Sequence, residues 1–306
     1  MRRFFVVTGA VAAGAFAWSR VRGRRPGIPK PVTGMFPNGM AYARLGTGSK
    51  TLLWILGGPG IGVPKGLRLA LLPFWYRPYV EKGYSVWIVA RKQGMPKGHT
   101  FADMAEDYAG LIADEFDGKV DLVIGEDNGG AVGFCLAARQ PERVGHIAIA
   151  AAGYEVSEQG KTLDYEFARL RSEGRSDEAF ALLLSALYPD IPIPGATRVL
   201  GALMARLLFA DANPHIASDV MVEAEAERAF DAREILPRIS VPVLLICGDG
   251  DLFVPKEVYE ETARLIPDCT LRIYEGKGLI GATSDKRFPG DVLDFVARHA
   301  RITPEE

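Results

Sequence analysis

Asp127 is the residue of this 306-residue chain whose setting most clearly suggests chemistry. It lies at the centre of segment 125–129 (Gly-Glu-Asp-Asn-Gly), between the apolar run 120–124 and a stretch with helical spacing that ends at Arg139. Glycines two residues to either side of the central position allow a sharp backbone turn that pushes one side chain outward, as at a nucleophile elbow. A carboxylate in that place can attack an electrophilic carbon and form an ester. A simpler interpretation is that Asp127 and Asn128 only cap the helix.

Two further segments could complete a site around Asp127. Segment 57–60 (Gly-Gly-Pro-Gly) follows an apolar run, and the backbone N–H of Gly58 could join that of Asn128 in an oxyanion hole. Asp251 follows another apolar run, in Gly-Asp-Gly-Asp-Leu, where a carboxylate could support a catalytic base. The alternative for Asp251 is an aspartate that caps a turn.

The elements that must position these residues alternate between short apolar runs and longer amphipathic ones. This alternation predicts an α/β protein with a mostly parallel sheet covered by helices on both faces. Between residues 153 and 242 only helical patterns occur, which predicts a helical insertion. The candidate strands are 51–56, 85–90, 120–124, 147–151, 243–247 and 271–274, and the candidate helices are 101–115, 130–139, 162–173, 177–188, 196–208, 217–229, 256–265 and 290–300.

Taken together, the glycine-proline loop, the elbow, the helical insertion and the Asp251 turn resemble the α/β-hydrolase superfamily over about residues 36–300. Segment 140–144 (Gln-Pro-Glu-Arg-Val) also matches the segment that commonly follows the elbow helix in that family. The resemblance implies an α/β-hydrolase domain over residues 31–306, with a helical lid at about 153–238. An aspartate at the elbow, in place of the commoner serine, is similar to the epoxide-hydrolase and haloalkane-dehalogenase branch, although Asn128 stands where dehalogenases commonly carry tryptophan.

The chain departs from the family at the catalytic base. After the last strand the family carries a histidine within Gly-x-Gly-His, and here residues 276–279 read Gly-Lys-Gly-Leu, so that Leu279 occupies the position of the base. Leucine can neither accept a proton nor orient water, and an ester formed on Asp127 would have nothing placed to hydrolyse it. Of the four histidines (His99, His146, His215 and His299), we consider only His215, in the expected lid, as a substitute base.

The missing histidine has an electrostatic consequence. Asp127 and Asp251 would share a partly apolar cleft without a cationic neighbour, so the pKa of at least one of them should be raised. A shared proton or a bound cation could relieve the repulsion, but no third ligand for a metal is evident, and we predict neither a metal site nor a cofactor.

Two functional interpretations remain open. The first is a protein with a small-molecule pocket, largely apolar and covered by the lid, in which the degenerate set of Asp127, Asp251 and Leu279 gives impaired or absent turnover. The alternative is an active hydrolase of an ester, an epoxide or a similar substrate that uses Asp127 as its nucleophile. The sequence does not identify the ligand.

The N-terminal segment 1–30 carries its own signals. An apolar run, 4–18, lies between Arg2-Arg3 and an arginine cluster at 20–25. The run is short for a membrane span but fits an export signal, whereas the following arginines favour retention on the cytoplasmic side. We expect a membrane anchor with a cytoplasmic body; export and a misassigned start are the alternatives.

Charge is distributed unevenly along the chain. The first 80 residues hold 12 basic and no acidic residues, and the remainder holds 24 basic and 38 acidic ones. An acidic body would repel phosphate backbones, so we expect no nucleic-acid partner, and the candidate partner surface is a membrane. The aromatic and basic segment 65–79 could contact lipid headgroups, but a helix packed on the sheet is the simpler interpretation. The three cysteines show neither disulfide nor zinc spacing.

Overall fold

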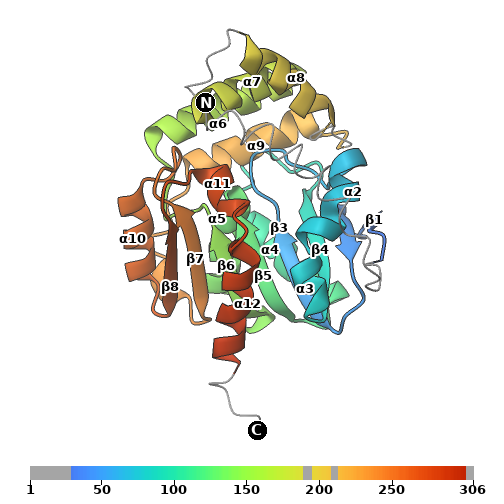
Figure 1. Ribbon diagram of the computed structural model, residues 1–306, viewed down its shortest axis with the longest axis vertical. Helices are drawn as coiled ribbons and strands as arrows, with labels where there is room; N and C mark the ends of the chain where they lie inside the picture. The colour runs from blue at the N-terminus through green and yellow to red at the C-terminus, as the bar shows by residue number, and fades with distance from the viewer. Residues whose placement is uncertain (1–28, 189–194, 208–212, 301–306) are drawn as a thin grey trace.

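The computed structural model describes residues 29–188, 195–207 and 213–300, and its centre is an eight-stranded sheet with the order β1-β2-β4-β3-β5-β6-β7-β8 (Figure 1). β1 and β2 pair antiparallel at one edge, β2 continues antiparallel on β4, and the other pairs are parallel. The central strands are buried on both faces, as expected of parallel strands covered by helices. The strands are β1 (Val32–Met35), β2 (Met40–Leu45), β3 (Lys50–Ile55), β4 (Tyr84–Lys92), β5 (Val120–Glu126), β6 (Val144–Ala150), β7 (Val243–Gly248) and β8 (Cys269–Tyr274).

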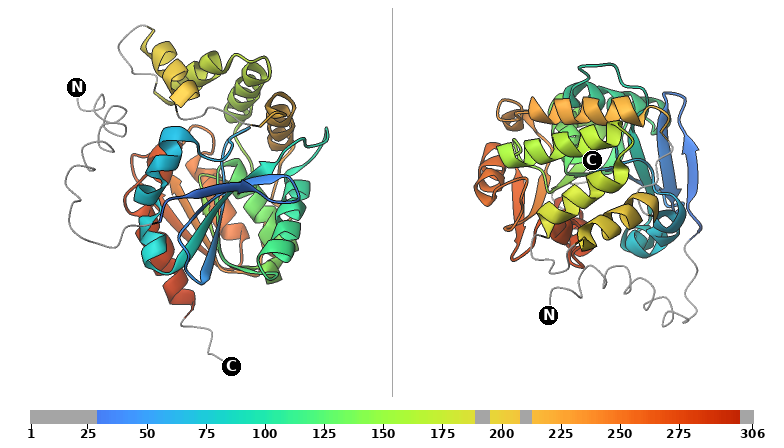
Figure 2. Two further views of the ribbon diagram at one scale, coloured as in Figure 1. Left: turned by 90° about the vertical axis from the view of Figure 1, so that its right-hand side faces the viewer. Right: turned by 90° about the horizontal axis from the view of Figure 1, so that it is seen from above.

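Helices cover both faces of the sheet and enclose two apolar cores (Figure 2, left). The larger core lies under α4 (Phe101–Glu115), α5 (Asn128–Arg139) and α10 (Lys256–Leu265), and the smaller one lies under α2 (Gly66–Trp75), α3 (Arg77–Glu81) and α12 (Phe288–His299). Thr100 begins α4 with a reciprocal capping box with Asp103. Two short 3-10 helices, Pro141–Arg143 and Leu236–Arg238, and α11 (Leu279–Thr283) complete the body.

A helical insertion lies between β6 and β7, over the carboxyl ends of the parallel strands (Figure 1). It consists of α6 (Glu158–Ser172), α7 (Ser176–Leu187), α8 (Ala196–Leu207) and α9 (Ile216–Arg228). α6 packs on α9, which contacts the body, while α7 and α8 pack on each other further out. The insertion has small apolar cores of its own, one of them around Phe167 and Phe180.

The predicted α/β class, mostly parallel sheet and helical insertion are confirmed. The strands β1 and β2 were not predicted. β1 is mostly exposed, and the buried residues of β2 (Met40, Ala43 and Leu45) do not alternate strictly, because the register shifts between Met40 and Tyr42. Segment 65–79 forms α2 and the beginning of α3, in which Leu72 and Tyr79 are buried, but Phe74 and Trp75 remain 59% and 44% exposed.

The N-terminal prediction falls on residues 1–28, outside the described part of the chain. Within the described ranges, none of the helices combines the length and the apolar character that crossing a bilayer requires.

Candidate active site

Asp127 stands at a sharp turn between β5 and α5, as predicted. Its backbone has a φ of 50° and a ψ of −124°, a strained conformation for a residue with a side chain. Neighbouring backbone atoms exclude any side chain at the two flanking glycines. A Cβ at Gly129 would lie 2.3 Å from the Ile55 carbonyl oxygen, and a Cβ at Gly125 would lie 2.4 Å from the Gly129 carbonyl oxygen. Close packing of the turn against β3 therefore maintains the strained conformation at Asp127.

The Asp127 carboxylate accepts the backbone donors that we assigned to an oxyanion hole. Gly58 has a φ of 66° and its N–H donates to Asp127 Oδ2 at 2.9 Å. The backbone N–H of Asn128 also stabilises the ionised form and, like Gly58, lowers the pKa of Asp127. Both donors are thus directed at the carboxylate of the protein itself.

Arg171 on α6 holds the loop that carries Gly58. Its Nη1 donates to the Gly60 carbonyl oxygen at 2.9 Å and to the Pro59 carbonyl oxygen at 3.3 Å. The buried guanidinium also lies over the rings of Phe167 and Phe180, 5.7 and 5.8 Å from their centroids. A charged side chain of the insertion therefore supports this loop, a role that the sequence analysis did not predict.

Asp251 lies in the turn after β7, where its oxygens are already engaged. Oδ1 accepts the backbone N–H of Phe253 at 2.9 Å, and Oδ2 accepts the hydroxyl of Tyr259 at 2.7 Å. Burial raises the pKa of Asp251, and these donors partly offset that rise. The geometry is that of a turn-capping aspartate, the alternative named from the sequence.

Leu279 begins α11 in the loop after β8 and packs against the larger apolar core. None of the contacts described for the four histidines reaches Asp127 or Asp251. His99 bonds Asp107, and His146 and His299 contact backbone carbonyls. His215 is exposed and lies beside Gly94. The geometry gives no support to His215 as a substitute base.

Two buried carboxyl groups of the insertion, Asp164 on α6 and Glu227 on α9, accompany Asp127. Asp164 is 5% exposed and Glu227 1% exposed. Asp164 and Asn128 lie close enough to lower the pKa of Glu227, yet neither Glu227 oxygen has a hydrogen bond of ordinary geometry within the described structure. Burial and then the Asp127 carboxylate raise the pKa of Glu227 to about 8, and burial and Glu227 raise that of Asp164 well above its usual range.

The predicted rise in carboxylate pKa is confirmed at Asp127. Burial, followed by the Asp251 carboxylate, raises the pKa of Asp127 to about 6. Together with Asp164 and Glu227 it forms a carboxyl cluster that must retain protons near neutral pH. In the part of the chain that the structure describes, no three His, Cys, Asp or Glu side chains are grouped so that they could hold a metal ion.

The sequence did not predict Asp164 or Glu227. A signal existed, because Asp219, Glu223 and Glu227 recur every four residues and therefore share one face of α9. All three are buried. Glu126, next to Asp127 in the turn, lies beside Trp54 and Arg68, and burial raises its pKa to about 7.

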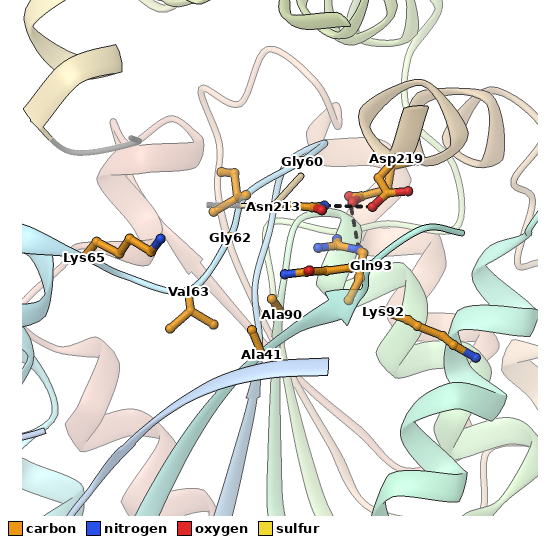
Figure 3. Close-up of a pocket in the computed structure, with 13 residues that line it drawn as sticks. Ala41, Gly60, Gly62, Val63, Lys65, Ala90, Lys92, Gln93, Asn213 and Asp219 are labelled. Atoms are coloured by element: carbon orange, nitrogen blue, oxygen red, sulfur yellow. Dashed lines mark hydrogen bonds and ion pairs between the residues drawn. The ribbon is translucent and has the colours of Figure 1, made fainter. Parts of the chain in front are cut away.

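A cavity of about 60 Å³ lies between α9, the end of β4 and the loop that follows Gly60 (Figure 3). Asp127 is not part of its lining. Glycine and aliphatic residues share this lining with charged side chains. The lining residues are Ala41, Gly60, Ile61, Gly62, Val63, Lys65, Ala90, Arg91, Lys92, Gln93, Asn213, Asp219 and Glu223.

The sheet order, the strained turn after β5, the glycine loop beside it and the insertion after β6 together define an α/β-hydrolase fold. The chain belongs to the α/β-hydrolase family, whose model matches residues 90–278.

Its relatives include hydrolases. The chain is 26% identical over 222 residues to the RutD protein of Yersinia enterocolitica, to which carbamate hydrolase activity is ascribed, covering 70% of this chain and 76% of that protein. It is 28% identical over 201 residues to a pimeloyl-[acyl-carrier protein] methyl ester esterase of Neisseria meningitidis, covering 58% of each. A hydrolase structure from Pseudomonas aeruginosa superposes with a TM-score of 0.66 at 21% identity, covering 87% of this chain and 98% of that one, which shows the shared fold.

Proposed function

We propose that this protein binds a small molecule between the inserted helices and the carboxyl edge of the sheet, and that it turns substrates over poorly or not at all. The observation that carries the proposal is the position of Leu279, which begins α11 after β8 and packs against the larger core in the place where the family resemblance expects the base. Loss of the base from such a catalytic set lowers the rate about 10⁴-fold or more.

The surroundings of Leu279 support the proposal. Asp251 would orient a histidine in an active relative, and here Tyr259 and the backbone of Phe253 use its oxygens. The Gly58 N–H, which would stabilise a developing oxyanion, is engaged by Asp127. The Asp251 carboxylate and the Gly58 N–H, which would act on a bound ester, are therefore already engaged within the protein.

A second candidate is an enzyme that uses Asp127 as its nucleophile. The contact from Gly58 to Oδ2 favours it, because it fixes one oxygen and leaves the other to attack. Attack on an epoxide carbon would form an alkyl ester to Asp127 while the ring oxygen takes the electrons of the broken C–O bond, whereas attack on the carbonyl carbon of an aryl ester would form a mixed anhydride and release the phenolate. Hydrolysis of that ester requires a base to take a proton from water, and the position of the base is occupied by leucine.

An incubation of wild type and Leu279→His with aryl esters and epoxides would distinguish the two candidates. Turnover and the intact mass of the protein would be measured. The matched control is Ile280→His, which adds the same imidazole one position along α11. We expect no sustained turnover by wild type. Multiple turnovers that disappear in Asp127→Ala would refute the proposal. A stoichiometric adduct on wild type that Leu279→His releases, and Ile280→His does not, would establish Asp127 as a nucleophile without a base.

A further inference from the structure

The cavity beside α9 contains a buried cation whose hydrogen-bonding capacity is largely unused. Arg91, at the end of β4, is 5% exposed and lines the cavity. Its Nε lies 3.1 Å from Glu223 Oε2 in a buried ion pair. Within the described structure, Nη1 and Nη2 have no hydrogen-bond partner. Because a buried polar group without a partner is costly, an acceptor from outside the described chain, either water or a ligand oxygen, would stabilise these N–H groups.

The acidic residues that face the cavity do not supply this acceptor. Asp219 accepts the backbone N–H groups of Gly94 and Met95, each at 2.9 Å, and the side-chain amide of Asn213 at 2.7 Å. Glu223 lies 3.1 Å from Arg91 Nε, and the backbone of Gly60 and the Arg171 charge also stabilise its ionised form. The acidic lining thus balances part of the positive charge but leaves the outer edge of the guanidinium unpaired.

Two lysines, Lys65 and Lys92, also line this cavity. The Lys92 ammonium points away from the cavity (Figure 3) and lies 3.6 Å from Asp107. The Lys65 side chain extends from the opposite side of the cavity, and the Gln93 amide lies between the two lysines (Figure 3). Arg91 therefore supplies a positive charge at a fixed position, and Lys65 supplies a positive charge on a flexible side chain. The Gln93 side-chain amide supplies an additional N–H donor.

We propose that this cavity binds the carboxylate of a small organic acid, with Arg91 as its main anchor. The two terminal nitrogens of a guanidinium form a planar fork that matches the two oxygens of a carboxylate. Asp127 does not line the cavity, although the Arg91 charge is close enough to lower the pKa of Asp127, and the inference holds whether or not Asp127 forms an ester. The two sites share the loop that carries Gly58 and Gly60, because Gly60 lines the cavity and Gly58 bonds Asp127.

The test is a titration of the whole protein with hexanoate, followed by calorimetry and by amide NMR shifts. Hexanamide, which has the same chain without the charge, and inorganic phosphate serve as comparison ligands. We expect saturable hexanoate binding, with shifts at Arg91 and Gln93, and at least about tenfold weaker binding of the other two. Equal binding of hexanamide, tighter binding of phosphate, or no saturable binding of hexanoate in the millimolar range would each overturn the proposal.

Variants assign the effect to residues. Arg91→Lys keeps a positive charge for Glu223 but removes the fork, so hexanoate affinity should fall about 10- to 100-fold. Lys65 is exposed, so that Lys65→Met should leave the fold intact and weaken binding severalfold. Lys97→Met is the matched control, because Lys97 is also exposed and does not line the cavity. Equal losses in the two lysine variants would show general attraction of anions and overturn the assignment, as would unchanged affinity in a folded Arg91→Lys variant.

Discussion

Glu227→Gln should stabilise the protein at neutral pH, although it removes a buried carboxyl group. Glu227 is 1% exposed, and its pKa rises from an ordinary value of 4.5 to about 8 in the folded protein. Between these values the folded state holds a proton that the unfolded chain releases, so the contribution of Glu227 to stability falls as pH rises from 4.5 to 8 and is constant outside this window. The slope is about 1.4 kcal/mol per pH unit, which gives a cost of about 3 kcal/mol at pH 7.

Glutamine has nearly the same shape and does not titrate, so the cost should be absent in Glu227→Gln. Urea unfolding of wild type and variant from pH 4 to pH 8 would measure it. We expect equal stability near pH 4 and a gain of about 3 kcal/mol for the variant at pH 7. Glu225→Gln is the matched control, because Glu225 is exposed on the same helix. A pH dependence that is the same in both variants, or a Glu227→Gln variant less stable than wild type at pH 7, would refute the reasoning.

Other perturbations probe the turn, the acid and the N-terminus. Gly129→Ala should lower the free energy of unfolding by about 3 kcal/mol, because its Cβ would overlap the carbonyl oxygens of Ile55 and Leu56. Gly110→Ala, whose Cβ meets nothing within 4 Å, should raise the free energy of unfolding by about 0.5–1 kcal/mol. Urea unfolding measures both, and equal effects would contradict the packing argument. Tyr259→Phe should cost about 1–3 kcal/mol and raise the pKa of Asp251, measured by carboxyl NMR; an unchanged pKa would show that the hydroxyl does not support Asp251. If residues 1–30 anchor the protein, the full chain should sediment with anionic vesicles and a chain that begins at residue 31 should not; sedimentation of both would place the membrane contact on the body.

The elbow could be predicted because its requirements are local. Two glycines at fixed spacing, a β-branched run before them and a helical pattern after them determine the turn at Asp127, and the structure adds only the backbone contacts that exclude a Cβ. The position of Leu279 could be predicted in the same way, because the family carries its catalytic histidine shortly after the last strand.

The carboxyl cluster could not be predicted in this way. Asp164 and Glu227 belong to separate helices, and only the packing of α6 on α9 brings them together. A stripe of acids on a helix such as α9 normally indicates a solvated face, so the pattern itself favours the wrong environment. Arg91 was missed for the same reason, since its burial depends on Glu223 of the insertion.

The hydrogen bonds from Arg171 to the Pro59 and Gly60 carbonyl oxygens connect α6 to the loop that carries the Gly58 donor of Asp127. Arg171 belongs to α6, so a displacement of α6 from the body would be transmitted to this loop. Lifting α6 would pull on the two carbonyls that Arg171 holds, and the Gly58 N–H lies on the same short loop. A displacement of α6 would then also break the hydrogen bond from Gly58 to the Asp127 carboxylate, so that the position of the insertion would control the charge environment of Asp127.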